Sequence, residues 1–572
     1  MLRMQRGLRI AAVAGGVGVG LWQTDRVVFC SAGERSLRTL AVGVRLAWMY
    51  KFEFEPATYD AVHAKAADLI LETCKKNSGL YIKFAQQIAT VSNILPPQWN
   101  GFRALYDNAP AVPLSSIERV FAAEFAGKQP SDLFDDFEPV PRASASIAQV
   151  HRARLKNSRQ YVAVKVQKPD VAVQVEADLL SFGVVMHLLQ ALFDLKLSWT
   201  LPSINSHLRQ ELDFVNEARN AEMAREHMKQ VEAFRGGVVA VPRIYWELTT
   251  PRIMTAEWID GQSFGDVEGV RRRWGPENVE KMMATLVNVY ADQLFRTGFL
   301  SADPHPGNIL IRPSPTNPKI PQLVLLDHGL YIRCSSEFVS DYRNLWVSLF
   351  SHKVEIVERI VKKWGIRDVQ LFAIGTLQKP WTKKVGFTGD INIARDVLDF
   401  EKVERDGTDG KLSVEQRIAM QAKMKQRVQE YLENTDVIPR ELIFVGRNLN
   451  IIRSNNKIYG SPVNRINLTA QWAIKVEDEI NPTKKSLFDI PTAVKQARQY
   501  STLTIISVGF YLTRLWNSVY SFYEYLKYDI LGIHRQSRSG SEKKGFEEIM
   551  EDAVRKQLYE QTGVLLDKTA FD

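Results

Sequence analysis

The stretch 301-SADPHPGNIL-310 constrains the fold of this chain more than any other. It places Asp303 and Asn308, separated by four residues, in a loop that two prolines stiffen. The catalytic loop of a kinase uses this spacing to set a base and a metal ligand at one phosphate. Because Asp-x-x-x-x-Asn is also frequent by chance, a surface turn is the alternative, and the neighbouring motifs have to decide.

Four further polar residues follow the order of a kinase around this loop. Lys165 lies mid-strand in 162-VAVKV-166, and Glu217 lies on a helical segment downstream of it. Glu257 begins 257-EWIDG-261, a hinge whose backbone could meet an adenine edge, and Asp327 follows an apolar strand in 326-LDHG-329. Each alone has an ordinary alternative: a snorkelling lysine, a surface salt bridge or a turn cap. Together and in order they predict a kinase-like fold.

This order assigns a role to each polar residue in binding ATP and Mg²⁺. Lys165 would hold the α- and β-phosphates, and Glu217 would hold Lys165 in place. Asp303 would orient the attacking hydroxyl or water as the catalytic base. Asn308 and Asp327 would hold magnesium across the phosphates, where it neutralises developing charge.

The loop before the lysine strand departs from ordinary kinases. Where those have a glycine-rich loop over the phosphates, this chain has 141-PRASASIAQVH-151. Alanine does not reach the positive-φ conformations that glycine adopts freely, so we expect a stiffer loop that cradles phosphate differently. The expected nucleotide contacts are Ala143, Ser144, Ala145 and Ser146.

Hydrophobic patterning predicts an α+β chain: a two-lobed, atypical protein-kinase-like fold with an N-terminal helical extension and a C-terminal helical tail. Strands are expected at 161–167 and 252–259, with long helical stretches at 170–231 and 275–300. The runs 308–311 and 322–327 should form a hairpin with a wide turn. The expected divisions are 1–35 (targeting or anchor), 36–135 (helical extension), 136–261 (N-lobe), 262–476 (C-lobe) and 477–572 (tail).

Composition excludes several other classes of protein. Of 572 residues, 45% are apolar and 24% charged, which is ordinary for a globular protein, and the formal net charge is +9. The sequence has no Lys/Arg run with interleaved aromatics, the pattern that would indicate nucleic-acid binding. The three cysteines, Cys30, Cys74 and Cys334, are far apart, so neither a disulfide framework nor a structural zinc site is expected.

The two ends of the chain have unusual compositions. Residues 1–24 carry three arginines and no acid. A mitochondrial presequence overlapping a weak anchor fits them best, and a secretory signal or no targeting role are the alternatives. Residues 500–528 hold nine aromatics and are expected to pack on the core or lie on a membrane rather than cross it. Beyond them, 535–545 reads as a flexible linker and 546–560 as a charged, exposed helix.

At these motifs, together with 83-KFAQ-86, the sequence resembles the UbiB family of atypical kinases (aarF-domain-containing, ADCK), in particular the mitochondrial branch with Asp-His-Gly in place of Asp-Phe-Gly. In that family a Lys-x-Gly-Gln helix folds over the nucleotide pocket and contacts a Glu-x-Asp pair. The resemblance places Lys83 and Gln86 on that helix and assigns the pair to Glu211 and Asp213. Ala85 departs from the pattern, as do Ser144, Ser301 and Ala256.

The resemblance implies ATP and Mg²⁺ as cofactors, little protein kinase activity, and a role in coenzyme Q or membrane lipid homeostasis. It implies the mitochondrial inner membrane as location and partner, with a quinone or phospholipid as ligand, and it names no protein partner. If 8–30 spans the membrane, the bulk faces the intermembrane space. A catalytically weak, nucleotide-regulated lipid-binding or scaffold protein is the alternative. A conventional protein kinase is disfavoured, because no Ala-Pro-Glu motif follows Asp327.

Overall fold

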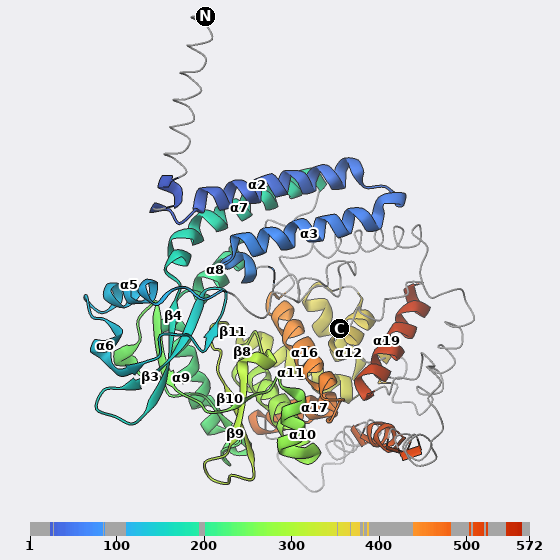
Figure 1. Cartoon of the computed structure of the whole chain (residues 1–572). Coiled ribbons are helices and arrows are strands. Elements are labelled where there is room, and N and C mark those ends of the chain that lie inside the picture. The colour runs from blue at the N-terminus through green and yellow to red at the C-terminus, as the bar shows by residue number, and fades with distance from the viewer. Residues whose placement is uncertain are drawn as a thin grey trace, which may run out of the picture. The chain divides into compact units, whose positions relative to one another are not determined.

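The computed structural model describes residues 23–26, 28–83, 85, 110–193, 201–351, 353–366, 368–377, 381–382, 386–387, 439–481, 503–504, 507–516, 518–519, 522–523 and 545–562 (Figure 1). The described chain divides into two compact units. Unit 1 holds the described residues up to Asn220 together with Pro242–Ile259, and unit 2 holds Ala221–Val241 and the described residues from Asp260 onward.

Unit 1 is built on an antiparallel sheet of five strands in the order β1-β3-β4-β6, with β2 paired to β3. The strands are β1 (Phe134–Phe137), β2 (Ala143–Ser144), β3 (Ala148–Leu155), β4 (Tyr161–Gln167) and β6 (Ile253–Glu257). Burial alternates along β4: Val162, Val164 and Val166 are fully buried, whereas Lys165 points to the opposite, partly open face. The period of two in the sequence therefore presents the lysine away from the core.

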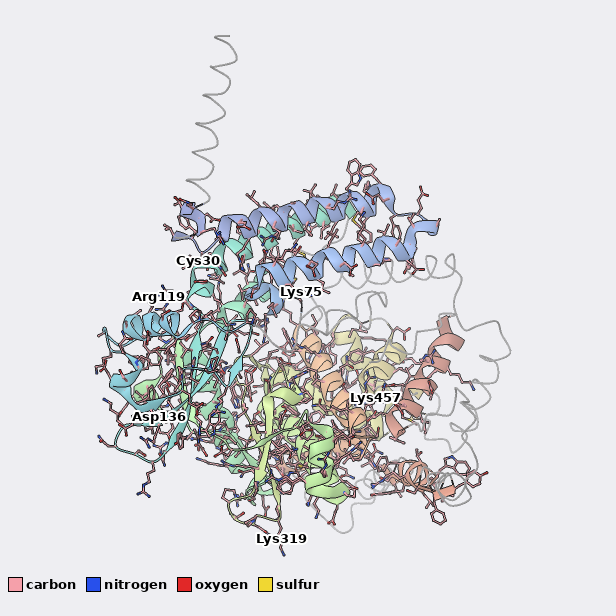
Figure 2. The ribbon with its side chains drawn as sticks, in the orientation of Figure 1. Cys30, Lys75, Arg119, Asp136, Lys319 and Lys457 are labelled. Carbon is pink, nitrogen blue, oxygen red and sulfur yellow. The ribbon has the colours of Figure 1, made fainter. Side chains whose placement is uncertain are left out.

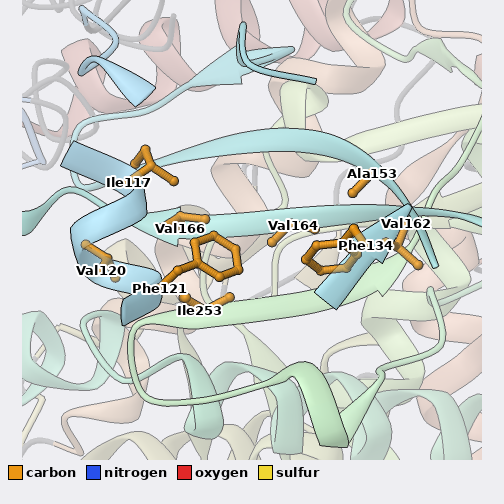
Figure 3. Packing of buried hydrophobic residues seen from close by; sticks show 9 residues of the cluster. All are labelled: Ile117, Val120, Phe121, Phe134, Ala153, Val162, Val164, Val166 and Ile253. Carbon is orange, nitrogen blue, oxygen red and sulfur yellow. The ribbon is translucent and has the colours of Figure 1, made fainter. Parts of the chain in front are cut away.

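The core of unit 1 lies between this sheet and helix α5 (Leu114–Glu124) (Figure 3). Ile117, Val120 and Phe121 of α5 point onto the buried valines of β4 and onto Ile253 of β6. The buried aliphatic side chains hold β4 rigidly, and burial of each such side chain contributes about 1.5–3 kcal/mol. The strand that carries Lys165 is thereby fixed by its other face.

Helices make up the rest of unit 1: α2 (Ala32–Trp48), α3 (Tyr59–Asn77), α7 (Pro169–Phe193), α8 (Leu201–Glu211) and the start of α9 (Phe214–Gln230). Helices α2 and α7 approach closely at Gly43. Any side chain at this position would clash, since an added Cβ would lie 2.8 Å from the Val185 side chain. Arg35 of α2 donates to Asp178 of α7 in a buried ion pair, with Nε 3.1 Å from Oδ1. Among the described helices only α7 is long and apolar enough to cross a membrane; 28% of its apolar window is buried, and the ion pair fixes one side of the helix against α2.

Unit 2 contains a four-stranded sheet in the order β5-β10-β9-β7 and a two-stranded sheet of β8 and β11. The strands are β5 (Val239–Ala240), β7 (Gln262–Ser263), β8 (Phe299–Ser301), β9 (Ile309–Pro313), β10 (Pro321–Leu325) and β11 (Tyr331–Arg333). Strands β9 and β10 pair antiparallel, with Leu325 opposite Ile309. The hairpin expected from the sequence is thus confirmed, and it brings Asn308 and Asp327 to the same end.

The helices of unit 2 are α10 (Val267–Asp292), α11 (Ser336–Phe350), α12 (Val354–Lys363), α13 (Val369–Leu377), α16 (Glu441–Ile458), α17 (Arg465–Ile480) and α19 (Phe546–Thr562), besides a short pair of strands, β12 (Trp381–Thr382) and β13 (Gly386–Phe387). Lys457, labelled in Figure 2, lies on α16 and donates to Glu551 of α19 at 3.1 Å. All three cysteines are free.

The stretch 170–231 is helical, as expected, and its described residues form three helices, the last of which, α9, is capped by Asp213, with its Oδ1 3.0 Å from the Val215 nitrogen. Two other sequence expectations needed correction. The helix expected from 275 begins at Val267, capped by Asp266 and kinked at Gly275, whose φ is +72°. Helix α19 was expected to be exposed, but it is packed, with Glu547 and Glu551 buried in ion pairs. Its charges suggested a solvated face because their partners lie far away in the sequence.

Candidate active site

Lys165 and Glu217 form a close ion pair in unit 1. The Lys165 Nζ lies 2.6 and 2.7 Å from the two carboxylate oxygens of Glu217. Glu217 is 2% exposed, and the Lys165 side chain is 23% exposed. The ring of Phe214 lies 5.0 Å below the ammonium. One end of the pair is therefore fixed in the core while the ammonium reaches the surface that a phosphate could approach.

Glu211 and Asp213, the Glu-x-Asp pair implied by the resemblance, make different contacts. Lys83 lies 3.4 Å from Glu211, which is 7% exposed, so the helical extension is tied to the end of α8. Asp213 instead caps α9, the helix that carries Glu217. Gln86 lies outside the described residues.

Ala85, which replaces the glycine of the family pattern, is fully buried. It packs in one cluster with Ala67, Cys74 and Tyr81 of the helical extension. The extra methyl therefore adds contacts within the extension.

The Ala/Ser loop forms a tight turn over the start of β3. The N–H of Ala145 donates to the carbonyl of Ala148 at 2.8 Å, and Ser146 is 7% exposed. The hydroxyl of Ser144 is buried and has no hydrogen-bond partner within the described part of the chain. A buried hydroxyl without a partner is costly, and a phosphate oxygen would satisfy it. This position therefore fits a nucleotide phosphate.

Lys168, which the sequence did not single out, ties this loop to the helical extension. Its Nζ donates to the carbonyls of Ala145 at 2.7 Å and Pro110 at 2.8 Å, and the residue is only 7% exposed. Because both acceptors are neutral, burial lowers the pKa of Lys168 to about 8. The sequence hardly indicates that Lys168 is buried, because a lysine at a strand end is ordinarily solvated.

The lowered pKa predicts a pH-dependent contribution of Lys168 to stability. Its folded-state pKa of about 8 lies below the value of 10.5 for a free lysine, so the unfolded state binds more protons between these values. The free energy of unfolding of the wild type should therefore rise relative to Lys168→Met as pH increases from 8 toward 10.5. Urea titrations of both proteins at half-unit pH steps measure this difference. A difference that is constant with pH would contradict it, and Lys168→Arg, which stays charged, should show no such rise.

Glu257 ends strand β6, as expected of a hinge. Its N–H donates to the carbonyl of Arg243 at 2.8 Å, and its neighbour Ala256 is 8% exposed and pairs with Ala163 of β4. The strand that Glu257 ends, β6, is thus paired with the strand that bears Lys165.

In unit 2, Asn308 and Asp327 lie side by side. The Asn308 Nδ2 is 3.1 Å from Asp327 Oδ2, and the N–H of Leu326 donates to the Asn308 carbonyl at 2.9 Å. The other carboxylate oxygen of Asp327 accepts the N–H of Gly329 at 2.9 Å. An amide and a carboxylate oxygen are thereby presented together at one end of the β9–β10 hairpin.

This pair suits Mg²⁺ better than an all-protein metal site. Among the described residues, no group of three His, Cys, Asp or Glu side chains could hold a metal ion. Magnesium is ordinarily held by one or two carboxylates together with substrate phosphates and water. Asp327 and Asn308 supply oxygen ligands of the right kind and leave the remaining positions to phosphate.

Side chains of helix α16 bind the loop that contains Asp303. The Arg447 guanidinium is 3.5 Å from the Asp303 carboxylate. Asn448 donates to the carbonyl of Ser301 at 2.7 Å, and Asn455 donates to the carbonyl of Pro304 at 3.0 Å. Ser301 replaces the histidine of ordinary kinases, and these two buried amides supply the backbone support that the histidine would give. None of the three α16 residues was expected from the sequence, where their only signal was the polar run 447-RNLNIIRSNN-456.

His328 of the Asp-His-Gly motif is 2% exposed. Its Nδ1 lies 3.1 Å from the Tyr331 hydroxyl and its Nε2 lies 3.1 Å from the Leu325 carbonyl. Burial raises the pKa of Tyr331, so the phenol stays protonated. His328 is thus a structural residue that fixes the turn following Asp327.

Comparison with known proteins gives a consistent result. The sequence model of the family described as ABC1 atypical kinase-like domain matches residues 104–361 of this chain. An ABC1 family protein of Schizosaccharomyces pombe is 33% identical over 82% of this chain and 84% of its own length. The ABC1 family protein lscO of Purpureocillium lilacinum is 31% identical over 82% of each chain. The AarF domain-containing protein kinase 1 of Xenopus laevis is 33% identical over 64% of this chain and 70% of its own.

Proposed function

Because this chain belongs to the ABC1 (AarF domain-containing) family of atypical kinases and is a kinase-type enzyme, we propose that it binds ATP with Mg²⁺ and transfers or hydrolyses the γ-phosphate. The observation that carries the proposal is the pairing of Asn308 with Asp327 at 3.1 Å beside the braced Asp303 loop. A chain without phosphoryl-transfer chemistry has no physical need for a metal-binding pair beside a positioned carboxylate.

The residues divide the chemistry as follows. Lys165, oriented by Glu217, pairs with the α- and β-phosphates, and the Ser144 hydroxyl donates to a phosphate oxygen. Asp303 accepts the proton of the attacking hydroxyl or water. Asn308 and Asp327 would hold Mg²⁺, which would supply positive charge beside the phosphates.

The acceptor is proposed to be water or the hydroxyl of a membrane lipid of the quinone or phospholipid class. A protein side chain is disfavoured, because the strand and helix after Asp327, β11 and α11, follow without a long activation segment. The ion pair of Lys83 with Glu211 also ties the helical extension to the end of α8, and the resemblance expects this extension to occlude a protein substrate. The location proposed is the mitochondrial inner membrane, in coenzyme Q or lipid homeostasis.

The test of this proposal is Asp303→Asn. The substitution keeps the shape of the side chain but removes the base, so ATP turnover by the purified chain should fall roughly 10²- to 10⁴-fold. Because the expected nucleotide contacts lie elsewhere, the affinity for ATP should change little. Turnover is measured with phospholipid vesicles present, and affinity by calorimetry. Asp478→Asn, the same change at an exposed residue of α17, is the control and should behave as wild type.

A scaffold that uses ATP as a conformational ligand is the competing function. The stiff Ala/Ser loop favours it. If wild type and Asp303→Asn hydrolyse ATP equally at background rate while both bind it, catalysis is excluded. Rescue of a deletion strain by Asp303→Asn and Asp327→Asn would then establish the scaffold role.

A further inference from the structure

The helical segment that includes residues 507–516, 518–519 and 522–523 in unit 2 has two apolar faces, of which only one is covered (Figure 1, orange-red ribbon). Its inner face is fixed to the unit: Phe510 is 3% exposed and its ring lies 5.2 Å from that of Phe546. Asn467 donates to the Leu503 carbonyl at 2.8 Å, and Arg514 donates to Glu280 of α10 at 2.8 Å. The segment therefore cannot rotate to bury its other face.

The outer face carries large apolar side chains at helical spacing, all of them exposed. They range from 48% exposed for Leu512 to 71% for Trp516. The stripe is Tyr511, Leu512, Leu515, Trp516, Val519 and Phe522. A contiguous stripe of this kind marks an interaction surface. We call it the aromatic stripe.

Helix α10, which the segment contacts through Glu280, carries a run of three exposed basic residues. Arg271, Arg272 and Arg273 lie seven to nine residues before Glu280, beyond the kink at Gly275, and Glu268 and Glu277 are acidic residues on the same helix. Farther along the sequence, 535-RQSRSGSEKK-544 contains four basic residues and one acidic residue. Tryptophan and tyrosine with flanking arginines are the residue types that favour the interface of a membrane with anionic headgroups.

We propose that the aromatic stripe docks unit 2 on the surface of an anionic phospholipid bilayer, with the helix lying in the interface and Arg271–Arg273 facing the headgroups. An amphipathic helix of this composition inserts its apolar side chains at the boundary between headgroups and acyl chains. The inference deepens the membrane location given under the proposed function and rests on it. It requires neither nucleotide binding nor turnover.

The test is co-sedimentation of the full chain with vesicles of phosphatidylcholine containing 30% phosphatidylglycerol, without nucleotide. The double variant Leu515→Glu/Trp516→Glu should bind at least 10-fold more weakly, because two exposed apolar side chains are replaced by anions. Changing Arg271, Arg272 and Arg273 to Gln should weaken binding to anionic vesicles by roughly 10- to 100-fold. It should leave binding to pure phosphatidylcholine unchanged.

Val140→Glu is the matched control, since Val140 of unit 1 is 73% exposed, close to the 71% of Trp516, and lies outside α7. It should bind vesicles as wild type does. Equal weakening by Val140→Glu, or unchanged binding of the double variant, would overturn the proposal. So would a wild-type dimer in light scattering that the double variant dissociates, because a second copy would then cover the stripe. Basal ATP turnover without vesicles, measured on the same proteins, separates a failed docking surface from a failed active site.

Discussion

Replacing Asp327 by asparagine should lower Mg²⁺-dependent ATP turnover by roughly 10²- to 10³-fold, the range seen when one electrostatic contact to a transition state is removed. The amide keeps an oxygen that can accept the Gly329 N–H, now 2.9 Å from Asp327 Oδ1, so the turn should persist. It lacks the negative charge that holds the metal, so the Mg²⁺ concentration for half-maximal rate should rise. Turnover measured over a magnesium titration checks both effects.

Two controls make this result specific to the metal site. The thermal midpoint of Asp327→Asn should fall by only a few degrees, the cost of losing the hydrogen bond from Asn308 Nδ2, and Asp478→Asn should keep full activity. If Asp327→Asn turns over ATP as fast as the wild type at limiting magnesium, Asp327 does not hold the ion.

Replacing Glu547 by alanine should cost about 3–5 kcal/mol of stability, since it leaves a buried arginine without its anion. Glu547 of α19 and Arg465 of α17 lie 3.0 Å apart, and both side chains are 2% exposed. Asn456 of α16 donates to the same carboxylate at 3.1 Å, so three helices meet at this group. Urea or thermal unfolding measures the loss.

A double variant tests whether the loss comes from the unpaired charge. Arg465→Met/Glu547→Leu removes both ions and should recover most of the stability, because a buried pair replaced by apolar residues is close to neutral. As a surface control, Glu277→Ala on α10 breaks an exposed pair with Lys281 and should leave the unfolding midpoint unchanged. A loss for Glu277→Ala as large as that for Glu547→Ala would contradict this account.

The sequence by itself determined the order and local setting of the candidate site. Lys165 lies in a strand whose alternating valines are readable as a half-buried pattern, and Asp327 follows an apolar run that becomes β10. Asp303 and Asn308 lie in one short loop, separated by four residues that include two prolines. These features depend on neighbours within a few residues, and local periodicity and turn chemistry suffice to predict them.

Only the tertiary structure decided what supports that site. Asn448 and Asn455 hold the carbonyls of Ser301 and Pro304 from 147 and 151 residues away. Lys168 reaches Pro110 across 58 residues, and Glu547 is buried against residues of α16 and α17. In a sequence, a polar side chain on a helix or at a strand end indicates exposure, because water is its default partner. A buried carbonyl or counter-ion replaces that water only when distant segments pack, and the sequence carries no local pattern for such a contact.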